Sequence, residues 1–342
     1  MTRWLPSLLF DHDFNSEKAG KKDMYNACEV SICIPTCNRP ELLELAIRSC
    51  LAQSYPNIHI LIGDDSTDDR TQELMRVCYA QERRIHYMRN ATPLGQGANV
   101  SFLFDRAAGD KILLLHDDDL LEPDGVETLL KLWDTVPDLE VAFGDQYVID
   151  IHGRTDQSQS AQCNIDFLRT HDAQGLQSVP GRTGLVSMFP NNGWLANTDL
   201  VKAVGYRPQY GAGCDFVFGV ELCLKAKKIY YIKRYVSSYR RTPNASSVVN
   251  RTSLRSSALE ALRLVSSLDL SQHLEPARRV AYKRMVPVAV STLSRNDDPV
   301  SGFRLAMRHL HAYHYGLSRR FYYHMMLIGT SLFRRARKFH RM

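Results

Sequence analysis

Three consecutive carboxylates follow directly on a run of leucines in the stretch LLLHDDDLLEPD, residues 113–124. Asp117, Asp118 and Asp119 repel one another, and a carboxylate in such a cluster resists ionisation unless a cation lies close to it. Hard carboxylate oxygens favour Mg²⁺ or Mn²⁺, and Mg²⁺ is usually held by one or two carboxylates together with substrate phosphates. The stretch therefore predicts a site for a metal and a diphosphate, with a solvated acidic turn as the alternative.

A second acidic cluster lies in GDDSTDD, residues 63–69. Ser66 or Thr67 is placed to cap a helix there, and carboxylates near the positive end of a helix dipole are stabilised by it. Such a helix start explains the last two aspartates of the cluster. It leaves Asp64 and Asp65 unexplained, because they precede the cap, so these two are candidates for binding a ligand.

The pattern of apolar residues predicts which elements position these side chains. Runs of β-branched and apolar residues predict strands, and helical spacing of apolar residues predicts the helices between them. The predicted strands are residues 30–35, 58–63, 84–88, 111–115 and 140–149, and the predicted helices are residues 38–54, 67–81, 97–109 and a segment starting near 123. Asn38 is placed as the N-cap of the first helix, with Glu41 at the capping-box position.

This alternation of strands and helices predicts an α/β fold with a mainly parallel central sheet. In such sheets, ligands bind beyond the carboxyl ends of the strands. Both acidic clusters follow the ends of predicted strands, so we expect them at the same edge.

We expect three parts in the chain: an N-terminal extension (1–28), a catalytic domain (29–250) and a basic helical region (251–342). Within the catalytic domain, residues 150–180 are polar and aperiodic and predict loops with a hairpin. The 342 residues are 44% hydrophobic and 23% charged, as is usual for a core-forming protein. The eight cysteines show no zinc-site spacing, which indicates reduced thiols in the cytosol.

The stretch VSICIPTCNRPELLELAIRSCLAQSYPNIHILIGDDSTDD, followed by PLGQGANVSFLFDRAAGDKILLLHDDDLLEPDGVE, resembles the family 2 inverting glycosyltransferases of GT-A fold. The motifs occur in the family's order and spacing, and the resemblance covers about residues 29–247. It implies a Rossmann-like domain that takes a sugar from a nucleotide-diphospho-sugar. The motif of processive polysaccharide synthases is absent, which favours a transferase that adds a single sugar.

The resemblance also implies roles for single residues on the donor side. Pro35 and Thr36 match the strand end that lines the base and ribose, and Asp65 matches the aspartate that bonds the base edge. Asn99 matches an asparagine near the diphosphate. His116-Asp117-Asp118 falls on the D-x-D (DXD) triplet, so Asp118, with His116 as a second ligand, would bind Mn²⁺ or Mg²⁺, and Asp117 would approach the ribose or the metal.

The later motifs imply residues for the acceptor side and for the phosphates. Asp215 matches the aspartate that opens a helix facing the acceptor, and it is the candidate general base. Capping of that helix is its alternative role, and Glu221 is the second choice for the base. Arg240 and Arg241, in a segment that resembles the loop closing near the diphosphate, are placed to pair with phosphate.

The resemblance implies an enzyme of bacterial surface-polysaccharide synthesis (O-antigen, capsule or exopolysaccharide) that acts on a glycan or lipid-linked acceptor. Four positions depart from the family pattern, namely Cys37, His116, Cys214 and Thr242. They keep open a catalytically degenerate GT-A-like module that serves as a binding or scaffold subunit. A nucleotidyltransferase is the third alternative, and the first strand lacks the Gly-rich basic loop that it would need.

The end of the chain is basic. Residues 299–342 hold nine Lys and Arg and no Asp or Glu, whereas the net charge of the whole chain is +6. One interpretation is a helical subdomain packed on the catalytic domain, and the other is peripheral attachment of a cytoplasmic protein to the anionic inner face of the membrane. The longest apolar run, residues 321–333, is shorter than the ~20 residues of a membrane-spanning helix. No nucleic-acid-binding module accompanies the charge, so nucleic acid is not an expected partner.

Overall fold

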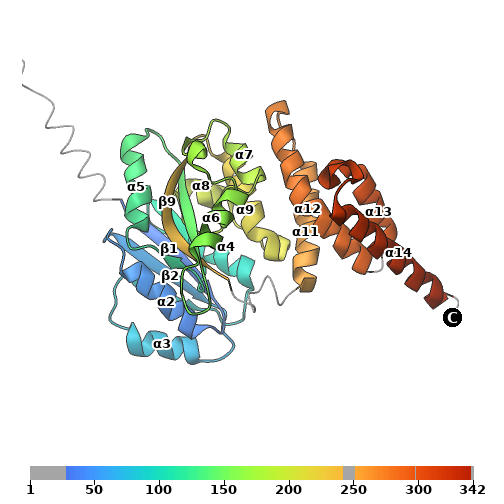
Figure 1. Ribbon diagram of the computed structural model, residues 1–342. Helices are drawn as coiled ribbons and strands as arrows, with labels where there is room; N and C mark the ends of the chain where they lie inside the picture. Colours follow the sequence, from blue (N-terminus) through green and yellow to red (C-terminus); the bar gives the residue numbers. More distant parts are fainter. Residues whose placement is uncertain (1–27, 242–250, 297, 340–342) are drawn as a thin grey trace, which may run out of the picture.

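The computed structural model describes residues 28–241, 251–296 and 298–339 (Figure 1). Within these ranges, a nine-stranded sheet has the order β3-β2-β1-β4-β8-β6-β9-β5, and β7 pairs with β9. The strands are β1 (Val30–Thr36), β2 (Ile58–Asp64), β3 (Ile85–Arg89), β4 (Lys111–Leu114), β5 (Leu120–Leu121), β6 (Val141–Ile149), β7 (Gly175–Leu176), β8 (Trp194–Asn197) and β9 (Ile229–Arg240). Neighbouring strands β3, β2, β1 and β4 run parallel, as do β6 and β9, whereas β8, β5 and β7 pair antiparallel. The predicted α/β fold with a mainly parallel sheet is confirmed.

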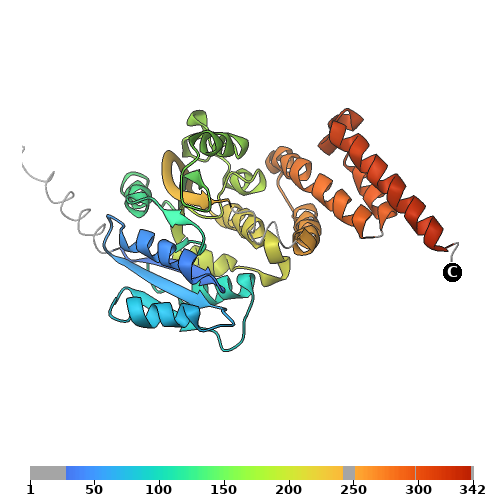
Figure 2. The same ribbon diagram turned by 60° about the horizontal axis from the view of Figure 1, so that its bottom comes forward.

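Helices cover both faces of this sheet (Figures 1 and 2). Within residues 28–241 they are α2 (Pro40–Leu51), α3 (Arg70–Cys78), α4 (Gln96–Arg106), α5 (Gly125–Thr135), α6 (Gln157–Asp166), α7 (Pro180–Leu185), α8 (Thr198–Val204) and α9 (Cys214–Lys225). Side chains alternate along β1, so Ile32 and Ile34 join the core under α2 and α5, and Cys33 joins the core under α4 and α9. Because both faces are covered, the central strands β1 and β4 are largely apolar and buried, which is why the sequence shows them so clearly.

The basic region is helical, as predicted. It comprises α11 (Arg251–Ser267), α12 (Glu275–Arg295), α13 (Pro299–Arg308), the 3₁₀ segment η4 (Leu310–Gly316) and α14 (Arg319–Phe339). Val265 of α11 and Ala281 of α12 are buried in the same core cluster as Trp194 of β8. Helices α13 and α14 pack on α12 and extend away from the sheet (Figure 2). Among the described residues, we find no helix that is both long and apolar enough to cross a membrane.

Two local predictions were wrong. Residues 150–180 contain helix α6, where the sequence indicated loops and a hairpin. The inner face of α6 carries Ser160 and Asn164, both buried, and Asn164 donates to the carbonyl of Gln146 on β6 at 2.9 Å. A helix that packs through polar side chains leaves no apolar periodicity to detect.

The helix starts after β1 and β2 also differ from prediction. Asn38 has a φ of +56° and does not cap α2, whose N-cap is Arg39. Its side-chain oxygen instead accepts from the backbone of Thr67 at 2.9 Å, and its backbone donates to the hydroxyl of Ser66 at 2.8 Å. Helix α3 begins at Arg70, so neither Ser66 nor Thr67 caps it. These residues bind the two loops to each other instead of starting helices.

A buried histidine makes the C-terminal helices sensitive to acid. His324 of α14 is buried, and its Nδ1 lies 2.8 Å from the hydroxyl of Tyr313. Burial, with Arg320 and Arg295 nearby, lowers the pKa of His324 to about 4. Since the unfolded side chain titrates near 6.5, the unfolded state binds the proton more readily between these values, and stability falls as pH drops from about 6.5 to 4. We expect the free energy of unfolding at pH 5, relative to pH 7, to drop by roughly 1–2 kcal/mol more in the wild type than in His324→Gln, measured by urea titration. An equal drop in both proteins would contradict a neutral folded His324.

Candidate functional site

The carboxyl ends of β1, β2 and β4 meet at one edge of the sheet. Thr36, the last residue of β1, lies in register with Asp64 of β2. The hydroxyl of Thr36 donates to Asp117 at 2.7 Å, so the segment after β4 reaches the end of β1. Both acidic clusters therefore lie at the same edge, as predicted from the order of elements.

The cation beside the carboxylates of the HDDD turn (residues 116–119) is Arg39, a residue that the sequence did not single out. Arg39, directly after β1, directs Nε to Asp117 at 3.1 Å and also contacts Asp117 through Nη2. Its Nη1 lies 2.9 Å from Asp118. Asp117 has no exposed surface, and burial raises its pKa to about 6 although Arg39 opposes the shift. Two features of the sequence could have identified Arg39. The three carboxylates require a cation at this strand end, and the segment Asn38-Arg39-Pro40 places an arginine just after β1.

The third carboxylate faces the opposite way. Asp119 is buried, accepts from the backbone of Arg240 at 2.8 Å and contacts the side-chain amide of Asn192. Arg240 is also buried; its Nε donates to the carbonyl of Asp118 at 2.7 Å and its Nη1 to that of Asp150 at 2.9 Å. Asp119 and Arg240 thus hold the HDDD turn against β9. Arg241 is exposed, and it donates to a side chain of α6.

The side chains matched to the nucleotide site lie close together around the end of β2. Asp65 accepts from Asn90 at 2.8 Å and from the backbone of Leu94 and Gly95 at 3.1 and 2.9 Å. Asn99 is buried and donates to the carbonyl of Gly63 at 2.8 Å. Asp65 therefore orders the segment between β3 and α4, and Asn99 binds α4 to the end of β2.

Pro35 is buried in β1, one residue before Thr36. A cavity of about 420 Å³ opens beside these strand ends. It is lined by Ser66, Thr67, Arg89, Asn90, Ala91 and Pro93.

His116 connects the acidic turn to the candidate base. Its Nε2 lies 3.3 Å from Asp215, and the hydroxyl of Tyr206 donates to the same carboxylate at 2.6 Å. Burial alone would lower the pKa of His116, but Asp215, with Asp119 and Asp118, raises it to about 10. The pKa of Asp215 is lowered, because His116 and Tyr206 outweigh its burial. The pair is therefore an imidazolium and a carboxylate.

Asp215 does not cap its helix. It is the second residue of α9, and the N-cap is Gly213. About a third of its side chain is exposed, and it borders a cavity of about 380 Å³. The other lining residues are Gln146, Cys163, Phe167, Arg169, Ser187, Phe189, Pro190, Asn191, Phe216, Tyr239 and Arg241. Four aromatic rings and several amide or guanidinium groups thus surround the space in front of Asp215.

Glu221 lies apart from this cavity, although it shares helix α9 with Asp215. Its carboxylate pairs with Arg207 at 3.0 Å, and its side chain is mostly buried. Burial raises the pKa of Glu221. Of the two candidate bases, Asp215 alone borders the cavity.

Of the HDDD residues that the structure describes, Asp118 is the one with room for a divalent metal. The described residues hold no group of three or more His, Cys, Asp or Glu side chains arranged for a metal. Both oxygens of Asp117 contact Arg39 or Thr36, and the Nε2 of His116 faces Asp215. Asp118 is 18% exposed, and Mg²⁺ commonly uses one protein carboxylate plus substrate phosphates. The donor set thus suits a metal that arrives with a diphosphate.

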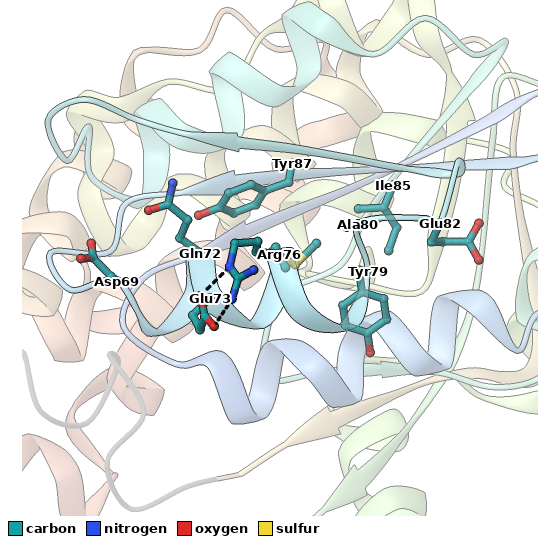
Figure 3. Close-up of a pocket in the computed structure, with 10 residues that line it drawn as sticks. Asp69, Gln72, Glu73, Arg76, Tyr79, Ala80, Glu82, Ile85 and Tyr87 are labelled. Carbon is teal, nitrogen blue, oxygen red and sulfur yellow. Dashed lines mark hydrogen bonds and ion pairs between the residues drawn. The ribbon is translucent and has the colours of Figure 1, made fainter.

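A further groove lies between α3 and β3 (Figure 3). Tyr79 and Tyr87 line it together with the ion pair of Arg76 and Glu73. It includes none of the HDDD residues and not Asp215, so it is separate from the site described above.

Comparison with known proteins identifies the domain. The family model "Glycosyl transferase family 2" matches residues 31–190, which include both acidic clusters. The chain contains a family 2 glycosyltransferase domain. The resemblance found in the motifs is confirmed.

Curated relatives and solved structures agree with this identification. The chain is 32% identical to the GalNAc(5)-diNAcBac-PP-undecaprenol beta-1,3-glucosyltransferase of Campylobacter jejuni over 104 residues, which is 30% of this chain and 34% of that protein. The chain spans only about a quarter to about half of the length of the first curated relatives that it matches.

Among solved structures, S. aureus TarS 1-349 in complex with UDP has a TM-score of 0.57 and 14% identity, over 83% of this chain and 89% of that one. The mannosyltransferase PcManGT from Pyrobaculum calidifontis, in complex with GDP-Man and Mn²⁺, has a TM-score of 0.56 and 13% identity, over 93% and 94%. These likenesses show that the glycosyltransferase domain has their fold.

The buried turn of the glycosyltransferase domain yields a stability prediction. Asp119→Ala would leave the backbone amide of Arg240 and the amide of Asn192 buried without their acceptor. An unsatisfied buried polar group costs about 1–3 kcal/mol, so we expect at least that loss in the free energy of unfolding by urea titration. Asp68→Ala, which changes an exposed aspartate, is the control and should change stability by less than about 0.5 kcal/mol. Equal small effects would show that Asp119 does not support the turn.

Proposed function

We propose that this chain is a metal-dependent inverting glycosyltransferase that moves one sugar from a nucleotide-diphospho-sugar to a hydroxyl of a glycan or lipid-linked acceptor. The observation that carries the proposal is the position of Asp215. This ionised carboxylate borders an aromatic cavity on one side and contacts His116 of the HDDD turn on the other. A base facing an acceptor space, next to the end of the donor-binding sheet, is what a direct displacement needs.

In the proposed reaction, Asp215 accepts the proton of the acceptor hydroxyl as that oxygen attacks the anomeric carbon. A bond forms between the acceptor oxygen and this carbon, and the bond from the carbon to the diphosphate oxygen breaks. The nucleoside diphosphate leaves with the electron pair, and one displacement inverts the configuration. His116 and Tyr206 keep Asp215 ionised and oriented before the step. A bound Mn²⁺ or Mg²⁺ held by Asp118 would neutralise charge on the diphosphate.

For the donor, we propose the space over the ends of β1 and β2. Pro35 and Thr36 end β1 there, and Asp65 accepts from Asn90, which lines a 420 Å³ cavity with room for a nucleobase. The UDP and GDP-Man complexes of the two structural neighbours support a nucleotide-sugar. Asp117 and Asn99 are buried, so their proposed role is to fix the loops that contact the donor.

Arg241 is the exposed member of the arginine pair and the better placed to reach a phosphate. It also lines the cavity in front of Asp215. Arg240 would act by holding the HDDD turn, because its guanidinium is buried.

For the acceptor, we propose the 380 Å³ cavity. The rings of Phe167, Phe189, Phe216 and Tyr239 offer faces on which a sugar can stack, and the amides of Gln146 and Asn191 offer hydrogen bonds. The undecaprenol-linked glycan named for the Campylobacter relative supports a lipid-linked acceptor and a role in bacterial surface polysaccharide.

Replacement of the base tests the catalytic assignment. Asp215→Asn should lower transfer by a factor of about 10²–10⁴ while leaving nucleoside diphosphate affinity nearly unchanged, because the amide cannot accept the proton. Release of nucleoside diphosphate from a panel of sugar nucleotides with Mn²⁺ measures activity, and thermal shift measures binding. Glu221→Gln, on the same helix but facing Arg207, is the matched control.

Three outcomes would contradict parts of this assignment. Loss of nucleotide binding in Asp215→Asn would make Asp215 structural, and full activity in the absence of divalent metal would exclude the metal role of Asp118. Wild-type protein that binds nucleotide but never turns over would favour the degenerate binding or scaffold subunit.

We also propose peripheral contact with an anionic membrane through α14. Tyr322, Met326 and Phe333 are each more than 60% exposed and lie at helical spacing on one stripe, and Leu317 just before α14 is 83% exposed. Arg319, Arg320 and Arg334 are exposed on the same helix, and residues 299–342 contain no acidic side chain. Apolar residues between arginines suit the headgroup region of an anionic bilayer, where a lipid-linked acceptor would lie.

Vesicle co-sedimentation tests this contact. The wild type should bind vesicles of phosphatidylcholine with 30% phosphatidylglycerol and release them at high salt, because each basic residue near the surface contributes about 1 kcal/mol. Serine at both Tyr322 and Met326 should lower binding several-fold without unfolding the protein, because both side chains are exposed. Val77→Ser removes an equally exposed apolar side chain on α3 and should have no effect. Wild-type binding to neutral vesicles alone, or none, would contradict the proposal.

A further inference from the structure

Arg39 occupies the position in which a cation would meet Asp118. Its Nε and Nη2 contact Asp117, which is also held by the hydroxyl of Thr36. Its Nη1 reaches Asp118 at 2.9 Å. The guanidinium thus bridges two carboxylates that differ in solvent exposure, because Asp117 is fully buried and Asp118 is partly exposed.

The two halves of this bridge differ in how easily they can open. Opening the contact with Asp117 would leave a buried carboxylate without its cation, which is strongly unfavourable. Opening the contact with Asp118 exposes a carboxylate that already reaches solvent, and it frees one edge of a guanidinium that is itself 35% exposed. The Asp118 half is therefore the one that can be exchanged.

The backbone around Arg39 confines the exchange to the side chain. The preceding residue, Asn38, is bonded through its amide N–H to Ser66 and through its side chain to Thr67. Pro40 begins α2 directly after Arg39. A rotation of the outer part of Arg39 thus moves Nη1 without moving the loop.

We propose that Arg39 is an internal counter-ion that couples the binding of metal and donor. Without ligand, it neutralises Asp118 and disfavours binding of a divalent cation alone. When a metal arrives with the donor, Nη1 leaves Asp118 for an oxygen of the diphosphate, while Nε and Nη2 stay on Asp117. Asp118 then becomes a ligand of the metal. The inference rests on the proposed function, because it takes the donor to be a nucleoside diphosphate sugar.

Coupled sites of this kind change each other's affinity by about 5- to 150-fold. The direct probe is the electron paramagnetic resonance of free Mn²⁺, titrated with protein in the absence and presence of UDP or GDP. In the wild type, Mn²⁺ alone should bind weakly, and the nucleoside diphosphate should tighten it by at least five-fold.

Two substitutions of Arg39 separate its contribution from the affinity of Mn²⁺ for the diphosphate itself. Arg39→Gln removes the cation, and Arg39→Lys keeps a charge for Asp117 but cannot contact both carboxylates through a fork. In each, Mn²⁺ alone should bind at least five-fold more tightly than in the wild type, and the additional effect of the nucleotide should shrink accordingly. Arg48→Gln is the matched control, because Arg48 lies on α2 and pairs with Glu44 away from the site.

The outcomes are distinguishable. If Arg39→Gln does not fold, circular dichroism shows it and Arg39→Lys carries the comparison. Folded variants that bind Mn²⁺ alone as the wild type does would overturn the counter-ion role, and so would a wild type whose Mn²⁺ affinity is the same with and without nucleotide. A wild type that binds neither UDP nor GDP with Mn²⁺ would overturn the proposed function and this inference together, whereas nucleotide binding with unaltered coupling overturns this inference alone.

Discussion

The structure of the site depends on the compensation of Asp117, a carboxylate with no exposed surface at the end of the central sheet. An ionised group in that position needs a cation and hydrogen bonds, and a lone charge there would be too costly. Arg39 and Thr36 supply both, and both come from the end of β1. The parallel register of β1 and β4 is therefore a requirement of the electrostatics as much as of the apolar core, because any slip would separate the carboxylate from its partners.

The same turn gives its carboxylates different surroundings. Asp119 faces inward and is bound by Arg240 and Asn192, which leaves Asp118 as the member that reaches solvent. His116, which departs from the family pattern, faces Asp215 instead of joining Asp118. The substitution thus places a cation between the turn and the candidate base. A family aspartate at this position would instead put two carboxylates in contact, so His116 and the ionised state of Asp215 are physically linked.

Helices and strands that depend on local sequence patterns could be predicted from the sequence. Contacts between distant segments could not. Strands such as 58–63 are largely apolar because both faces are covered, and their order alone places the two acidic clusters at one edge. The pairing of Arg39 with Asp117 joins residues 78 positions apart, and that of His116 with Asp215 joins the HDDD turn to a helix near the end of the domain. No periodicity encodes such pairs. Helix α6 escaped prediction for a related reason, since its buried face is polar.

The C-terminal helices differ in how far they take part in the core. Helices α11 and α12 contribute to the core under the sheet, so removing the whole region would expose apolar surface of the glycosyltransferase domain. Helix α14 packs on α12, not on the sheet, and keeps an apolar stripe in solvent between arginines. Stability alone does not require that stripe, because exposed apolar residues contribute nothing to the core. The inner helices therefore account for the packing, and the outer helix is the part that is available for a partner.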